Sequence, residues 1–203
     1  REEPRSGRFA PAGQSTQLIV GADGSTDATF LRTAETLYAS YNLRRVYYSA
    51  FSPIPHASAD LPVRAPALMR EHRLYQADWL LQHYGYGADE IVAPLREGLL
   101  DLDIDPKLAW ALAHRDAFPV DVNLAERATL LRVPGLGVRN VRRLLALRRQ
   151  RRVRYADLVK LRCDVRKAGP FVVTADHVPR DDTLASPALR ARLASPSQQL
   201  PLL

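Results

Sequence analysis

The sequence predicts an α/β region followed by a mainly helical region. Two short β-branched runs enclose a helical segment, a longer helix follows them, and two further apolar-patterned segments are joined by a glycine turn. The chain has 203 residues, of which 46% are hydrophobic and 25% charged, so it suits one or two globular domains. The sequence contains no apolar run near the ~20 residues that span a bilayer.

The first part of the chain has the pattern of a β-α-β unit. Residues 17–21, QLIVG, predict a buried strand that ends at glycine, and residues 45–51, RVYYSAF, predict a second strand. Helical spacing covers residues 27–41, with Thr26 as the expected N-cap and Asp27 in the first turn. This order implies that the two strands are parallel.

The middle of the chain predicts a proline-rich loop and then helices. A long helix is expected over 67–86, ended by Gly85 or Gly87, and a short one after Asp105 as N-cap. The long helix carries a polar patch formed by Glu71, His72, Arg73, Tyr75 and Asp78. These side chains suit a solvated face, pairing within the molecule, or contact with DNA.

Positive charge is concentrated in one window. The net charge is +7, yet residues 127–156 hold ten arginines and no acidic residue, which leaves 19 basic and 22 acidic side chains elsewhere. A local excess of this kind indicates an anion-binding surface.

The same window has the pattern of two helices joined by a tight turn. Asn123 is expected to cap the first helix, and Val138 to open the second. The apolar residues expected to face inward are Leu124, Ala128, Leu131, Val141, Leu144 and Leu145. At ~100° per residue, the opposite face of the second helix gathers Arg139, Arg142, Arg143 and Arg149.

The two glycines of the turn suggest a binding function for it. Gly135 and Gly137 allow backbone angles closed to other residues, and they let main-chain N–H groups approach a phosphate at a helix N-terminus. The expected DNA contact, independent of base sequence, comprises Val133, Pro134, Gly135, Leu136, Gly137, Val138, Arg139, Arg142 and Arg143. The alternatives are an αα-hairpin with a solvated basic face, or a surface that binds an acidic protein.

The stretch LLRVPGLG and the V-x-x-V-x-x-LL pattern after it resemble a helix-hairpin-helix DNA-binding motif of competence and repair proteins. In double motifs a second hairpin follows the first. Here residues 162–165, Arg-Cys-Asp-Val, stand where two glycines are expected. The second hairpin is therefore expected to support packing and not to bind phosphate.

A wider resemblance covers most of residues 8–173. The segments AGQSTQLIVGA, RRVYYSAFSPIP, REHRLYQADWLLQHYGY and LDLDIDPKLAWALAHRDAFPVDVN, followed by the hairpin, resemble DNA modification or repair proteins of the radical SAM superfamily. The resemblance implies the last part of a partial (β/α) barrel, a [4Fe–4S] cluster and S-adenosylmethionine. The family binds its cluster through Cys-x3-Cys-x2-Cys, whereas this chain has only Cys163. It is therefore expected to be a C-terminal portion of such an enzyme, or a descendant that kept only the DNA-binding part. The alternative is a stand-alone, non-catalytic DNA- or RNA-binding protein with no iron–sulfur partner.

The resemblance, together with the Pro- and Ser-rich composition of residues 175–203, divides the chain into four expected regions. Residues 1–60 would be the β-α-β part of the barrel, 61–120 a helical connector, 121–174 the helix-hairpin-helix domain, and 175–203 a disordered tail. Gln14, Gln17 and Gly21 are candidates for contact with the adenosyl cofactor, although a capped strand-to-helix turn explains Gly21 equally well.

The remaining expectations concern metals, catalysis and location. No metal site is expected, because the histidines are scattered and the run Asp101–Asp105 lacks the glycine of a calcium loop. No residue is assigned a catalytic role. A single cysteine favours a reducing cytoplasmic setting, where a DNA-binding protein would be associated with the nucleoid. The expected partners are DNA and the missing N-terminal radical SAM portion, and no membrane.

Overall fold

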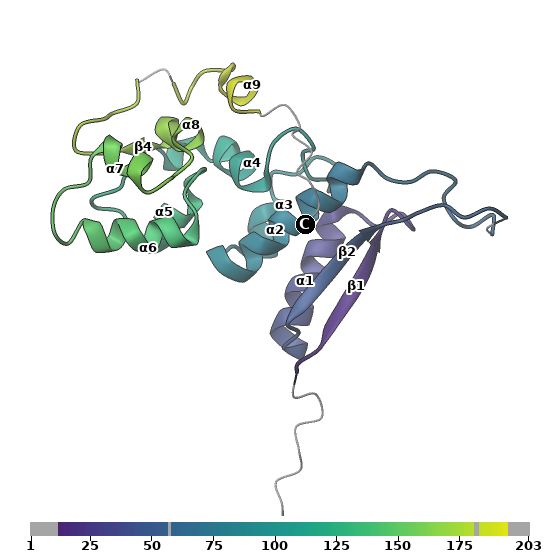
Figure 1. Cartoon of the computed structure of the whole chain (residues 1–203). Helices are drawn as coiled ribbons and strands as arrows, with labels where there is room; N and C mark the ends of the chain where they lie inside the picture. The colour runs from purple at the N-terminus through teal and green to yellow at the C-terminus, as the bar shows by residue number, and fades with distance from the viewer. Residues whose placement is uncertain (1–11, 57, 181–182, 195–203) are drawn as a thin grey trace, which may run out of the picture.

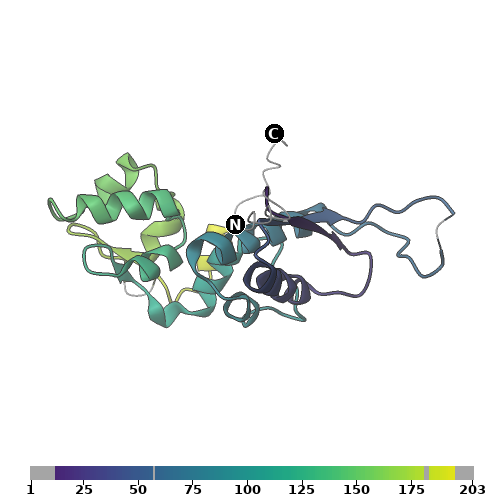
Figure 2. The same ribbon diagram turned by 90° about the horizontal axis from the view of Figure 1, so that it is seen from below.

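The computed structural model describes residues 12–56, 58–180 and 183–194. The fold is mixed α/β with two small parallel sheets. The first sheet and α1 form a sheet part, and α4 to α8 form a helical part. Figure 1 and Figure 2 show these two parts on opposite sides of α2. Buried apolar side chains from both parts belong to one continuous core.

The sheet part is the predicted β-α-β unit. Strand β1 (Ser15–Val20) pairs in parallel with β2 (Arg45–Ala50) along its whole length, and α1 (Asp27–Tyr41) connects them. Thr26 caps α1 as expected, since its side-chain oxygen accepts a hydrogen bond from the Thr29 amide at 3.2 Å. The predicted parallel pairing is therefore confirmed.

Asp27 does more than lie at the positive end of a helix. Its side chain is fully buried, and it accepts hydrogen bonds from Arg70 Nε at 2.6 Å and from the Leu100 amide at 2.9 Å. One carboxylate thus joins α1 to the following long helix and to the loop before α4. Its partners are 43 and 73 residues away in sequence, so local patterning could not reveal them.

Helix α2 (Leu68–Tyr84) covers the outer edge of β2. Ala50 N–H donates to Glu71 Oε2 at 2.7 Å, and Tyr48 N–H donates to the Tyr75 hydroxyl at 3.0 Å. A strand edge left unpaired would require water or another strand. Here side chains of α2 take that role. Gly85 ends the helix with φ 72°, as predicted.

Short helices and a second small sheet complete the helical part. Helix α3 (Ala88–Val92) and α4 (Pro106–Ala113) follow α2, and Asp105 caps α4 through a 2.9 Å bond from the Leu108 amide, as expected. Strand β3 (Val120–Asp121) pairs in parallel with β4 (Val172–Val173). Strands of two residues carry too little pattern to be predicted. The remaining elements are η1 (Arg115–Ala117), α5 (Arg127–Arg132), α6 (Val138–Leu147), α7 (Tyr155–Lys160), α8 (Val165–Ala168) and η2 (Gly169–Phe171).

The prediction that Asn123 caps the first hairpin helix is wrong. Helix α5 begins at Arg127, and the exposed Leu124 lies before it. The Asn123 side chain instead pairs with the backbone of Val153, accepting from its N–H at 2.7 Å and donating to its C=O at 3.2 Å. It therefore connects the two helical hairpins, which a sequence-local cap rule could not indicate.

The expected disordered tail over 175–203 is also wrong for residues 189–193, which form a helix. Helix α9 (Leu189–Leu193) buries Leu189 and Leu193 against the core, and Arg190 pairs with Asp101 at 2.6 Å. Two apolar residues one turn apart suffice to anchor so short a helix, although the segment has no sustained periodicity. Residues 195–203 lie outside the described part of the chain.

The buried Asp27 carboxylate should carry a large share of the stability of the sheet part. We expect Asp27→Ala to lower the free energy of unfolding by about 3–5 kcal/mol, because Arg70 is left without its partner. Urea denaturation measures this loss. The matched control is Asp89→Ala, which removes an exposed pair with Arg32 and should cost less than about 1 kcal/mol. Equal losses in the two variants would contradict the assigned role.

Candidate nucleic-acid interface

The predicted turn forms a tight hairpin loop at residues 133–137, between α5 and α6. Gly135 has φ +78°, and Gly137 is the extended N-cap of α6. Val133, Pro134 and Leu136 are buried, so their side chains shape the hairpin from within and are not available to a ligand. Within the loop, only Gly135 and Gly137 are partly exposed.

Gly135 is required by packing between two hairpins as well as by its backbone angle. A Cβ at this position would overlap the carbonyl oxygen of Asp164 and lie 3.1 Å from the Ala168 amide. The Asp164 N–H also donates to the Gly135 carbonyl at 3.2 Å. The glycine therefore lets two backbones touch, whereas the sequence had suggested only close approach to a phosphate.

The second hairpin, residues 161–164, has a similar shape but a different chemistry. Arg162 has φ +58°, so a non-glycine residue occupies the left-handed conformation there. Asp164 caps α8 with its own carboxylate, which accepts from the Lys167 amide at 3.1 Å. An anion from the protein already occupies the start of this helix. This geometry agrees with the expectation that the second hairpin supports packing.

The start of α6 is different, because Gly137 offers no side-chain acceptor. Within the described residues, the amides of Arg139 and Asn140 have no hydrogen-bond acceptor, and the Val138 amide faces the Tyr84 hydroxyl. Burial raises the pKa of Tyr84, and the Val138 amide opposes that shift. Free N–H groups and the helix dipole together favour an anion at this end.

Three exposed arginines lie beside these amides. Arg139, Arg142 and Arg143 form no ion pair or hydrogen bond with any described residue. On the opposite face of α6, Val141 and Leu144 are fully buried, as predicted. The helix thus has one face in the core and one cationic face exposed to solvent.

Three arginines of the basic window, residues 127–156, form ion pairs or hydrogen bonds within the protein. Arg132 pairs with Glu90 at 2.8 Å, Arg151 pairs with Asp157 at 2.7 Å, and Arg148 donates to the Ala125 carbonyl at 2.6 Å. Arg132 joins α5 to α3, Arg148 joins the end of α6 to the turn before α5, and Arg151 bonds the first turn of α7. The other arginines of the window are exposed, and they are Arg127, Arg139, Arg142, Arg143, Arg149, Arg152 and Arg154.

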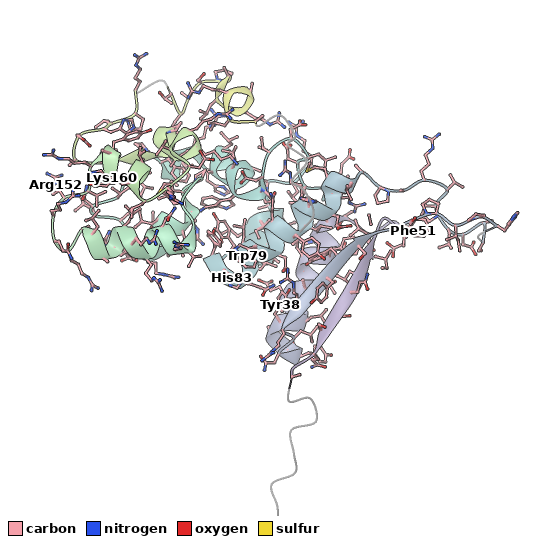
Figure 3. All side chains as sticks on the ribbon, viewed as in Figure 1. Tyr38, Phe51, Trp79, His83, Arg152 and Lys160 are labelled. Carbon is pink, nitrogen blue, oxygen red and sulfur yellow. The ribbon has the colours of Figure 1, made fainter. Side chains whose placement is uncertain are left out.

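The cationic surface continues past α6. Arg152, Arg154 and Lys160 line a hollow of about 530 Å³ next to the Arg151–Asp157 pair. Figure 3 shows Arg152 and Lys160 at the outer end of the helical part. Arginines from α6 and from the start of α7 therefore face solvent from one hairpin unit, with Asp157 already neutralised by Arg151.

The polar patch predicted on α2 is mostly paired within the molecule. Glu71 and Tyr75 bond the edge of β2, and Arg73 donates to the Leu102 carbonyl at 2.8 Å. Asp78 is 3% exposed and accepts from the Tyr38 and Tyr48 hydroxyls, and burial raises its pKa against these bonds. His72 alone of the patch remains without a partner among the described residues.

A groove of about 570 Å³ lies between α2 and the start of α4, and sequence reasoning did not predict it. It is lined by Arg45, His72, Gln76, Trp79, Tyr84 and Lys107, among others. Lys107 is 8% exposed, and its ammonium donates to the Leu136 carbonyl at 2.6 Å. The groove thus adjoins the hairpin loop directly. Its residues come from three distant segments, so no local motif marks it.

The three candidates for cofactor contact do not converge. Gln14 donates to the Tyr41 carbonyl at 2.8 Å, and Gln17 donates to the Ser49 hydroxyl at 2.6 Å. Gly21, with φ +78°, packs against Pro66 at the other end of β1. The side-chain amides of Gln14 and Gln17 thus bond the segment that follows α1 and strand β2.

Cys163 does not provide a cluster ligand. It is 8% exposed, and burial raises the pKa of its thiol to about 11, partly offset by a hydrogen bond from Asn140. A [4Fe–4S] cluster requires several thiolates, and this chain has one cysteine. The residues of this chain therefore do not fit the cluster of the radical SAM family. Within the described ranges, no group of His, Cys, Asp and Glu could hold a metal ion.

Comparisons with models of protein families, with curated proteins and with solved structures found no match. The helices of residues 12–56, 58–180 and 183–194 are all too short or too polar to cross a membrane.

The backbone contact between the two hairpins predicts that replacing Gly135 lowers stability more than replacing a glycine that has open space around it. Gly85→Ala adds a Cβ into open space at φ +72°, so it should cost only the left-handed strain of about 1–2 kcal/mol. Gly135→Ala should cost a further ~1–3 kcal/mol, because its Cβ meets the Asp164 backbone. Denaturant unfolding of the two variants measures the difference. Similar losses would show that the backbones are not in contact.

Lys107 predicts a pH dependence of stability. Burial lowers the pKa of its ammonium from 10.5 to about 7, against the attraction of Asp105. Between these values the unfolded chain binds a proton that the folded chain lacks, so wild-type stability should rise with pH by about 1.4 kcal/mol per unit relative to Lys107→Met. Below pH 7 the difference should level off. Urea unfolding of both proteins from pH 6 to about 9.5 tests this, and parallel curves would contradict it.

Proposed function

We propose that this chain binds DNA through the phosphate backbone, independently of base sequence, using the hairpin loop and α6 as a helix-hairpin-helix motif. The observation that carries the proposal is the start of α6. Unbonded amides there lie next to Arg139, Arg142 and Arg143, and no carboxylate from the described part of the chain caps the helix.

Each residue has a distinct role in this contact. Because Gly137 has no side chain, the Arg139 and Asn140 amides stay without an acceptor, and they bind a phosphate oxygen with help from the helix dipole. The three arginines bind flanking phosphates, where a guanidinium can donate two parallel hydrogen bonds. Val133, Pro134 and Leu136 hold the loop in place from the core. Phosphate contacts carry no base information, so affinity should depend on salt and not on sequence.

The resemblance to radical SAM proteins extends this proposal to DNA modification or repair. The parallel β1-α1-β2 unit is compatible with the end of a (β/α) barrel, and the neighbouring helical part would position DNA for it. The one buried cysteine cannot hold the cluster, so we assign this chain DNA binding and no step of the chemistry. A stand-alone nucleic-acid-binding protein would use the same surface.

Salt titration tests the phosphate contact. A labelled duplex is titrated with wild type and with a variant carrying Arg139→Ala, Arg142→Ala and Arg143→Ala. We expect weaker binding by the variant, and a log–log salt slope flatter by about 0.9 for each phosphate contact removed. Unrelated duplexes should compete equally well with the labelled one.

A matched control separates local contact from net charge. The variant Arg64→Ala, Arg96→Ala and Arg180→Ala removes the same charge from exposed positions away from the hairpin. It should keep nearly the wild-type salt slope. If both triple variants lose affinity equally, or if wild type binds no duplex at low salt, the hairpin is not the DNA contact. Binding to an acidic protein would then explain the arginines.

A further inference from the structure

The groove between α2 and α4 contains an exposed aromatic side chain. Trp79 is 49% exposed and packs edge-on against His83, with ring centroids 4.1 Å apart. Figure 3 shows the two side chains near the C-terminal end of α2, between the sheet part and the helical part. The other tryptophan, Trp110, is 6% exposed in the core. A half-exposed indole on a well-packed helix offers a flat face for stacking.

Polar groups suited to hydrogen bonding lie on the same stripe of α2. His72, Gln76 and Trp79 are separated by four and three residues, so they share one helix face. Gln76 accepts from Arg73 through its oxygen at 2.8 Å, which leaves its amide N–H groups available. Most other polar groups of this helix are paired, as described above. The groove therefore combines an aromatic face with donors and acceptors at its side.

The groove also adjoins the proposed phosphate site. Tyr84 lines it, and the Tyr84 hydroxyl lies 3.6 Å from where a Cβ on Gly137 would be. Lys107 lines it as well and bonds the loop carbonyl of Leu136. Arg45 adds an exposed cation at the mouth. A DNA strand whose phosphate sits at the start of α6 would place its neighbouring nucleotide beside this groove.

We propose that the groove binds an unpaired base of the DNA held by the hairpin, with Trp79 stacking on the base and His72 and Gln76 bonding its edge. A base inside an intact duplex is stacked on both faces and cannot enter, so the preferred ligand has a bulged, mismatched or single-stranded nucleotide. The volume of about 570 Å³ is ample for one base. This inference rests on the proposed DNA binding and adds its substrate class.

The experiment compares two duplexes with equal charge. One carries a single bulged thymidine, and the other carries a bulged abasic nucleotide at the same place. Wild type should bind the bulged base about 5-fold to 150-fold more tightly, as expected for base–aromatic stacking. Trp79→Ala should abolish this preference and keep affinity for a fully paired duplex. Trp79→Phe should retain part of it, because a smaller aromatic face remains.

A control variant checks that the preference for the bulged base depends on the groove. Tyr41→Ala removes another exposed aromatic side chain, at the end of α1, and should leave the preference unchanged. Equal binding of the two bulged duplexes by wild type, or a preference that survives Trp79→Ala, would overturn the base-binding groove while leaving duplex binding intact. Absence of binding to every DNA would overturn the groove and the proposed function together.

Discussion

The hydrogen bonds between α2 and the outer edge of β2 determine how the rest of the molecule is arranged. A two-stranded sheet is marginal alone, because each strand has an edge of unpaired amides. Glu71 and Tyr75 accept from that edge, while Asp78 accepts from two tyrosine hydroxyls behind it. These contacts fix the rotation of α2 about its axis. Trp79 consequently faces the groove, and Tyr84 reaches the start of α6.

Lysine and arginine side chains then attach the two hairpins to α3 and to the start of α4. Lys107 bonds the Leu136 carbonyl, Lys167 pairs with Asp105 at 2.6 Å, and Arg132 pairs with Glu90 while lying over the Tyr86 ring. Partly buried pairs contribute modestly to stability, since desolvation offsets their attraction. They do specify orientation, because each requires a particular partner. The hairpin is therefore held with its glycine loop next to the groove and its arginines exposed.

Local patterns in the sequence predicted the elements, and distant contacts account for what they missed. The two β-branched runs and the Thr26 cap predict the parallel β-α-β unit, and the glycines at 135 and 137 predict the hairpin loop. Asn123 was assigned to the nearest helix by a cap rule, yet its partner is Val153. The helix at Leu189–Leu193 depends on a core built from earlier segments. The groove likewise exists only once α2 and α4 are packed.

The two hairpins show why charge in a sequence window overstates the surface that can bind an anion. Both have one residue with positive φ and one buried residue before the second helix, so their backbones turn in a similar way. The Asp164 carboxylate accepts from an amide of α8, whereas Gly137 leaves the Arg139 and Asn140 amides of α6 without an acceptor. Arg132, Arg148 and Arg151 serve the fold. In the proposed DNA contact, phosphate affinity would therefore come from the first hairpin, whose second helix has no capping carboxylate among the described residues, and the preference for an unpaired base from the adjoining groove.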